Sequence, residues 1–222
     1  RAQPFRYIAH NGEINPVRGN INWMNAREAL FKSVNFSDAE LKMLNPICNK
    51  DNSDSANLDM AIELLVLSGR SLAQVMMMMV PEAWQTQTNM DATKRAFYEY
   101  YACIMEPWDG PASLSFSDGN VIGATLDRNG LRPSRYLLTE DGTLVMGSET
   151  GTLCVDQSTV VEKGRLQPGK IFIADLEQGR IISDDEVKAQ VSSAQPYAQW
   201  LDENKIELDQ LPVPTAYIAQ PP

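Results

Sequence analysis

The chain has 222 residues, 43% of them hydrophobic, which is enough for one large domain or two small ones around a buried core. Its formal net charge of -10 argues against nucleic acid or an anionic membrane as a partner, because both attract basic surfaces. Three scattered cysteines and a single histidine form neither a disulfide framework nor a metal-binding pattern. No apolar run has the length of a membrane span or the context of a signal peptide, so we expect a protein of the reducing cytoplasm.

A short apolar run near the N-terminus is followed by two turn-forming residues. Residues 7–9 have the length and composition of a strand, and we predict that the chain turns at Asn11-Gly12. The Asn11 amide donates hydrogen bonds, and Gly12 has no side chain to shield its backbone N–H. Two such donors side by side are the components of an oxyanion hole. An ordinary hairpin turn of the Asn-Gly type is the alternative interpretation.

Helical patterns separated by loops occupy the following segment, up to about residue 105. Asn20 or Asn22 is the expected N-cap of the first helix, and Gly69 and Pro81 are expected to end the third and fourth. The run of four methionines at 76–79 is expected to fill the core. The predicted helices cover residues 23–30, 39–44, 58–65, 72–80 and 91–105.

From residue 112 the hydrophobic period changes from helical to strand-like. Apolar runs flank three turn pairs, at 118–119, 141–142 and 178–179, which predicts three hairpins that build an antiparallel sheet. Helices are predicted again at 184–193 and around 199–201, and residues 211–222, with four prolines, are predicted to form a linker or tail. Helices followed by an antiparallel sheet indicate the α+β fold class.

Three motifs stand out along the chain: His-Asn-Gly-Glu at 10–13, Ser-Asp-Ser at 53–55, and Asp-Arg-Asn-Gly-Leu-Arg-Pro at 127–133. Together they resemble the class II glutamine amidotransferase domain, an N-terminal-nucleophile hydrolase. Longer strings look closest to the large subunits of glutamate synthases, at residues 3–15, 18–24, 106–112 and 146–151. The resemblance runs from about residue 2 to about residue 211. It implies that residues 1–210 are a partial domain of this type and part of a four-layer αββα fold.

The resemblance also implies a reaction. In the family, a cysteine thiolate attacks the side-chain amide of glutamine, ammonia leaves, and a glutamyl thioester is hydrolysed. In glutamate synthases the ammonia passes to 2-oxoglutarate at a flavin and iron–sulfur site. We therefore expect glutamine as substrate, the remaining synthase domains as partners, and FMN and an iron–sulfur cluster in the parent enzyme. No cofactor or metal is expected in this chain.

Matching residues carry the family's roles to this sequence. Asn11 and Gly12 match the oxyanion hole, through a side chain and a backbone N–H respectively. Asp54 matches the acid that binds the substrate α-amino group, and an N-cap of the following helix is its alternative role. Arg128 and Arg132 match an arginine-rich loop near the active centre, for which we expect a structural role.

Departures from the family pattern concern the nucleophile above all. The family uses an N-terminal cysteine, whereas residue 1 here is Arg1, and none of the three cysteines matches. We therefore expect a glutaminase-domain fragment that has no nucleophile and is inactive alone. Its missing strands are expected to leave an open sheet edge that favours self-association. Pro16 stands where threonine is expected, and His10 is expected to be a satisfied core or turn residue rather than a base.

Two alternatives remain open. The domain could serve another acceptor, as in asparagine synthetase, phosphoribosyl amidotransferase or hexosamine-phosphate synthase, although the Trp23 helix and the string at 106–112 argue against these. It could also be a non-catalytic interaction module on the same fold. A cysteine at the start of the mature native chain would favour the enzyme.

Overall fold

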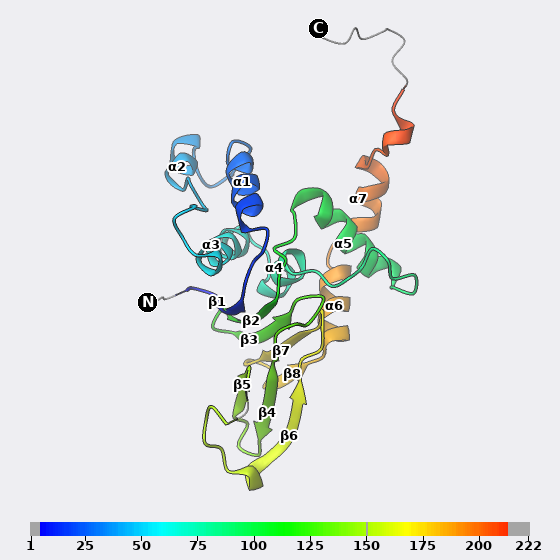
Figure 1. The fold of residues 1–222 in the computed structure, drawn as a ribbon. Coiled ribbons are helices and arrows are strands. Elements are labelled where there is room, and N and C mark those ends of the chain that lie inside the picture. Colours follow the sequence, from blue (N-terminus) through cyan, green and yellow to red (C-terminus); the bar gives the residue numbers. More distant parts are fainter. Residues whose placement is uncertain (1–4, 150, 213–222) are drawn as a thin grey trace.

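The computed structural model describes residues 5–149 and 151–212, and it has three layers: helices, a five-stranded sheet and a three-stranded sheet (Figure 1). The helices are α1 (Val17–Glu28), α2 (Asp38–Met43), α3 (Asp54–Leu67), α4 (Leu72–Met79), α5 (Ala92–Ile104), α6 (Asp184–Ser193) and α7 (Tyr197–Asn204). The strands are β1 (Ile8–Gly12), β2 (Ala112–Ser117), β3 (Val121–Leu126), β4 (Arg135–Thr139), β5 (Leu144–Gly147), β6 (Val160–Arg165), β7 (Ile171–Asp175) and β8 (Arg180–Ile182). Two short 3-10 turns are η1 (Gln157–Thr159) and η2 (Leu208–Gln210).

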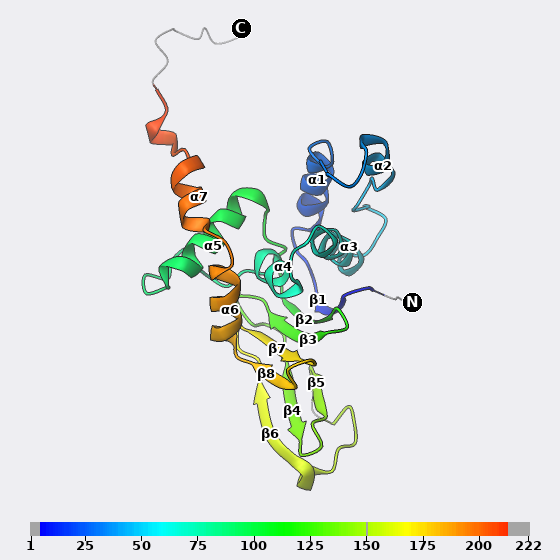
Figure 2. The same ribbon diagram turned by 180° about the vertical axis from the view of Figure 1, so that it is seen from behind.

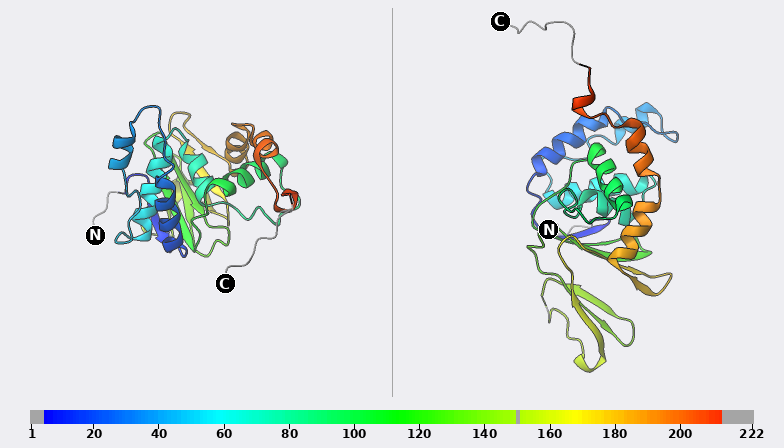
Figure 3. Two further views of the ribbon diagram at one scale, coloured as in Figure 1. Left: turned by 90° about the horizontal axis from the view of Figure 1, so that it is seen from above. Right: turned by 90° about the vertical axis from the view of Figure 1, so that its right-hand side faces the viewer.

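The α+β class is confirmed. Seen from behind and from the side, the helices lie over one face of the larger sheet, and the smaller sheet projects away from them (Figures 2 and 3). Among the residues described, no helix covers the outer face of the smaller sheet (Figure 3). The chain therefore presents three layers of the four that we expected for the complete domain. None of the described helices has the length and apolar character needed to cross a membrane.

The five-stranded sheet runs in the order β1-β2-β3-β7-β8, and every pair is antiparallel. Because side chains alternate between faces, Leu114 and Phe116 of β2 point into the helical core, whereas Ser113 and Ser115 face the smaller sheet. The β2–β3 hairpin forms at the predicted Asp118-Gly119 pair, where Asp118 accepts hydrogen bonds from two backbone N–H groups.

The main core lies between the helices and this sheet. All four methionines of α4, at 76–79, are buried in it, which confirms the prediction that they fill the core. An aromatic cluster joins α5 to α7: the Phe97 and Tyr197 rings meet edge to face with centroids 5.3 Å apart. Such pairs contribute about 0.5–1.5 kcal/mol beyond the area that they bury.

The smaller sheet, in the order β5-β4-β6, corrects the expectation that the three hairpins build one sheet, and it is the second β layer that the resemblance implied. The hairpin at Asp141-Gly142 does form, but it pairs with β6, a strand that the sequence did not predict. Its sequence, Val-Val-Glu-Lys-Gly-Arg, has no apolar alternation, and most of it is exposed. Tyr136 and Met146 of this sheet pack with Phe172 of β7 in a second, smaller core.

Two helix starts differ from the predictions. Helix α1 begins at Val17, directly after Pro16, because the Asn20 side chain is buried and donates to the Pro107 carbonyl instead of capping a helix. Helix α3 begins at Asp54. The other predicted helices match the structure within a residue or two, and Gly69, at φ +99°, follows the end of α3 as expected. Of the predicted tail at 211–222, residues 213–222 lie outside the described part.

Candidate functional site

Asn11 and Gly12 lie inside β1, so the prediction of a turn at this pair is wrong. They face Ser113 and Ala112 of β2. Pairing continues past the strand end, because the Glu13 N–H donates to the Pro111 carbonyl (3.1 Å) and the Asn15 N–H donates to the Asp109 carbonyl (2.9 Å). These long-range hydrogen bonds hold the segment extended, and the chain turns only at residues 15–16.

Only glycine fits at position 12, because the backbone at Pro111 lies in direct contact with it. Its φ is +147°, and a Cβ added there would overlap the Pro111 carbonyl group. Backbone N–H groups of a strand alternate in direction, and the Glu13 N–H points toward β2. The Gly12 N–H therefore points the opposite way, to the edge of β1 that has no strand beside it in the described sheet.

Two carboxylates from α3 partly cap this free edge. Asp59, only 5% exposed, accepts the N–H groups of residues 6–8 at 2.8–3.1 Å. Asp54 Oδ2 accepts the Ile14 N–H at 2.9 Å. Between them, the N–H groups of His10 and Gly12 have no acceptor among the side-chain and loop hydrogen bonds of the described residues. A carboxylate and an unpaired N–H thus lie along one strand edge.

Asp54 is the first residue of α3 rather than its cap. Ser53 is the N-cap, and its hydroxyl accepts the Ala56 N–H at 3.2 Å, so the alternative role for Asp54 is wrong. The second oxygen of Asp54 accepts the Ser55 N–H at 2.7 Å. The carboxylate, half-buried at the positive end of the helix dipole, therefore ties α3 to the end of β1.

His10 points away from Asn11, toward α3. Its Nδ1 lies 2.8 Å from the Ser55 hydroxyl oxygen, whereas its Nε2 is buried without a hydrogen-bond partner among the described residues. Burial lowers the pKa of His10, against the opposing effects of the Asp54 and Glu13 carboxylates, and the Arg132 guanidinium lowers it further. The imidazole is therefore neutral at pH 7, and the expectation of a satisfied histidine holds for one nitrogen only.

A cavity of about 160 Å³ lies between the two sheets, beside β1. Asn11 lines it together with Ser113 of β2 and Ser148 at the end of β5. The other lining residues are Ala9, His10, Ser115, Ser134, Met146 and Gly147. Five of the nine lining residues carry an amide or hydroxyl group and none is Asp, Glu, Lys or Arg, so the cavity suits a neutral polar group such as a carboxamide. The serines were missed from the sequence, where the polar positions at 113 and 115 look like an exposed strand face.

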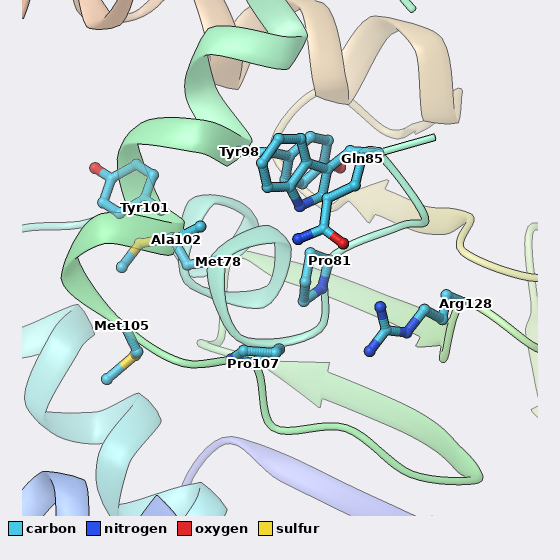
Figure 4. Close-up of a pocket in the computed structure, with 10 residues that line it drawn as sticks. Met78, Pro81, Gln85, Tyr98, Tyr101, Ala102, Met105, Pro107 and Arg128 are labelled. Atoms are coloured by element: carbon cyan, nitrogen blue, oxygen red, sulfur yellow. The ribbon is translucent and has the colours of Figure 1, made fainter. Parts of the chain in front are cut away.

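A second cavity, of about 60 Å³, lies beside α4 and α5 (Figure 4). Methionine, tyrosine and proline side chains line most of it, and Arg128 reaches in from the loop after β3 (Figure 4). Arg128 pairs with the Asp109 carboxylate, and the Asp109 carbonyl holds the Asn15 N–H. This contact favours the structural role expected for Arg128. Arg132 Nε is buried and has no partner among the described residues.

The cysteines do not belong to this site. Cys48 is buried, and desolvation together with the nearby Glu28 and Glu106 raises the pKa of its thiol to about 12. A thiol with that pKa supplies no thiolate at neutral pH. Cys103 and Cys154 are exposed, and neither lines the cavity. Within residues 5–149 and 151–212 no group of three or more His, Cys, Asp or Glu side chains could hold a metal ion.

Comparison with known proteins decides the family. The family profile "Glutamine amidotransferases class-II" matches residues 1–200. The chain belongs to the class II glutamine amidotransferases. The resemblance in the three sequence motifs is thereby confirmed.

Glutamate synthases are relatives of this amidotransferase chain. The NADPH glutamate synthase large chain of Bacillus subtilis (strain 168) is 53% identical over 209 residues, covering 94% of this chain and 14% of the relative. The NADH enzyme of Schizosaccharomyces pombe is 49% identical, with 95% and 10% covered. The ferredoxin-dependent enzyme of Pyropia yezoensis is 47% identical, with 95% and 14% covered. The chain therefore spans about a tenth to a seventh of these relatives.

A solved structure of glutamine phosphoribosylpyrophosphate amidotransferase from B. subtilis aligns with 82% of this amidotransferase chain and 30% of its own. The two share 17% sequence identity, with a TM-score of 0.40.

Proposed function

We propose that this chain is part of the glutaminase domain of a glutamate synthase large chain. In the parent enzyme, glutamine is hydrolysed to glutamate, and the ammonia is channelled to 2-oxoglutarate. The identity of about 50% to glutamate synthases along nearly the whole chain supports this acceptor over those of other class II amidotransferases. FMN and an iron–sulfur cluster belong, in this proposal, to other parts of the parent polypeptide, which we assign to the cytoplasm.

The observation that carries the glutaminase assignment is the surroundings of β1. A polar cavity lined by Asn11 lies on one side of this strand, and the Gly12 N–H, which has no acceptor among the described residues, lies at its outer edge. We assign the cavity to the carboxamide of glutamine. The Asn11 amide and the Gly12 N–H stabilise the oxyanion that forms when the carboxamide carbon is attacked. Asp54, on the same edge, binds the positively charged α-amino group.

The nucleophile in this proposal is a cysteine that precedes Arg1 in the parent polypeptide. Its thiolate adds to the amide carbon, and the C–N electron pair leaves with a proton as ammonia. Water then cleaves the resulting thioester to give glutamate. The cysteine's own α-amino group, rather than His10, serves as the base, in keeping with the family. We also propose that any self-association of the isolated chain occurs through the edge of β1.

A direct test compares two proteins: the 222-residue chain, and the parent polypeptide extended upstream to its cysteine. We expect ammonia release from glutamine by the extended protein only, and none after its cysteine is changed to alanine. Turnover by the 222-residue chain that disappears in Cys48→Ser, Cys103→Ser or Cys154→Ser would contradict the proposal. So would a folded, cysteine-bearing parent that does not hydrolyse glutamine.

A further inference from the structure

Asp127 is a buried carboxylate directly after β3, only 1% exposed. Its two oxygens accept three backbone N–H groups: Oδ1 accepts that of Ala112 at 3.0 Å, and Oδ2 accepts those of Asn129 and Gly130 at 2.9 and 3.0 Å. No lysine or arginine of the described residues forms an ion pair with it. Among the described residues its oxygens are therefore held by backbone N–H groups rather than by a cation, which is a demanding arrangement for a buried carboxylate.

The hydrogen bond from the Ala112 N–H connects Asp127 to the candidate site. Ala112 is the register partner of Gly12. The peptide group between Pro111 and Ala112 is held at both ends: its oxygen accepts the Glu13 N–H at 3.1 Å, and its N–H donates to Asp127. The Asp127 N–H in turn donates to the Ala112 carbonyl at 3.0 Å.

Gly12 allows close contact between β1 and the Pro111–Ala112 peptide. Because it has no Cβ, the Pro111 carbonyl packs directly against it, in space that any side chain would fill. A shift of the Pro111–Ala112 peptide therefore moves Gly12 and the peptide groups on either side of it. One of these groups carries the unpaired Gly12 N–H.

We propose that Asp127 is a positioning residue, which holds the Gly12 N–H in place through the Pro111–Ala112 peptide. This inference rests on the proposed glutaminase function. A carboxylate is needed because three N–H donors converge on it. In asparagine an NH2 group would replace one of the two carboxylate oxygens. This NH2 group would face at least one of the backbone N–H groups, donor against donor, and no hydrogen bond would form there.

A purely local role is the competing explanation, because Asp127 also closes the turn at Asn129-Gly130. Asp127→Ser separates the two roles, since a serine hydroxyl supports such a turn but is too short to reach Ala112 as well. Asp118 supplies the matched control. It closes the β2–β3 hairpin at the far end of the same strands, where it accepts the N–H groups of Asn120 and Val121.

The experiment measures kcat, glutamine KM and melting temperature in the cysteine-bearing parent enzyme. We expect Asp127→Asn and Asp127→Ser to lower kcat at least about tenfold, with a much smaller change in KM, because a small misplacement of a catalytic donor is costly. Asp118→Asn should leave kcat unchanged. A folded Asp127→Ser enzyme with wild-type kcat would overturn the inference. A wild-type parent without glutaminase activity would contradict the proposed function instead.

Hydrogen exchange in the 222-residue chain gives a second readout that needs no activity, and its first comparison needs no variant. The Ala112 and Glu13 amides should be strongly protected, because their partners are Asp127 and Pro111. In Asp127→Ser both should exchange faster, whereas Asp118→Asn should leave them unchanged. An Ala112 amide that exchanges as fast as exposed loop amides in the wild type would overturn the inference even if no Asp127 variant folds.

Discussion

Gly12 shows how a single residue sets the geometry of the strand edge. A Cβ at this position would overlap the Pro111 carbonyl, whereas Gly119, also at positive φ (+97°), has open space around it. We predict that Gly12→Ala lowers the free energy of unfolding by more than about 2 kcal/mol, because steric overlap adds to backbone strain. Gly119→Ala should cost about 1 kcal/mol, from backbone strain alone. Equal losses in urea denaturation would contradict the packing that we describe.

His10 makes stability depend on pH. Burial lowers its pKa below 6.5, so the unfolded chain binds this proton more readily than the folded chain. The folded state therefore loses stability as the pH falls through 6.5. His10 is the only histidine, and no other side chain type ordinarily titrates there. We predict that His10→Gln reduces the loss of stability between about pH 7.5 and 5.5. Identical pH profiles for both proteins would contradict the burial of this neutral imidazole.

At the scale of elements, local signals in the sequence predicted most of the fold. Helices α4, α5 and α6 lie where they were predicted, Gly69 and Pro81 follow the ends of α3 and α4, and the three hairpins form at the predicted turns. The predictions fail where contacts between residues far apart in the sequence determine the local structure. Asn11-Gly12 stays extended because residues 109–112 pair with the segment beyond it, and β6 forms only because β4 offers it an edge.

The same contrast between local sequence signals and distant contacts holds for the candidate site. Asn11 and Gly12 were singled out by their two adjacent donors and by a family motif, and Asp54 by a family motif; the structure brings all three to β1 or its edge. The roles of the cavity serines, Asp59 and Asp127 were missed, although Asp127 begins one of the three motifs, because they depend on strand register and on backbone groups far away in the chain. Neither feature has a local sequence signal.

The buried ammonium group of Lys188 connects helix α6 to neighbouring segments. Lys188, only 3% exposed, contacts Glu82 at 3.2 Å, Asp184 at 2.9 Å and the Gly169 carbonyl at 2.8 Å. We predict that Lys188→Met lowers the free energy of unfolding by about 2 kcal/mol, because it removes a buried donor from Glu82, Asp184 and the Gly169 carbonyl, while Lys94 and Lys170 still pair with the two carboxylates. Lys205→Met is the control: Lys205 also pairs with two carboxylates, but solvent screens them, so the loss should be much smaller. Similar losses would show that the Lys188 cluster is not buried in solution.

At the scale of the whole molecule, the two sheets and the helical layer converge on β1. Its side chains alternate between the helices, where His10 contacts α3, and the space between the sheets, where Asn11 lines the cavity. Its free edge carries the Gly12 N–H between two capping carboxylates from α3. One strand thereby contributes to the proposed amide pocket, oxyanion hole and amino-group site.

Asn11 donates to the oxyanion in the proposed reaction, and kcat of an Asn11→Ala variant of the cysteine-bearing parent enzyme tests this role most directly. Alanine is compatible with the strand but removes the amide donor. We predict that kcat for glutamine falls about a hundredfold to a thousandfold, with a much smaller change in KM. Asn120→Ala, at the exposed β2–β3 hairpin, should leave both unchanged. An Asn11→Ala enzyme that melts like the wild type and retains its kcat would show that Asn11 does not stabilise the oxyanion.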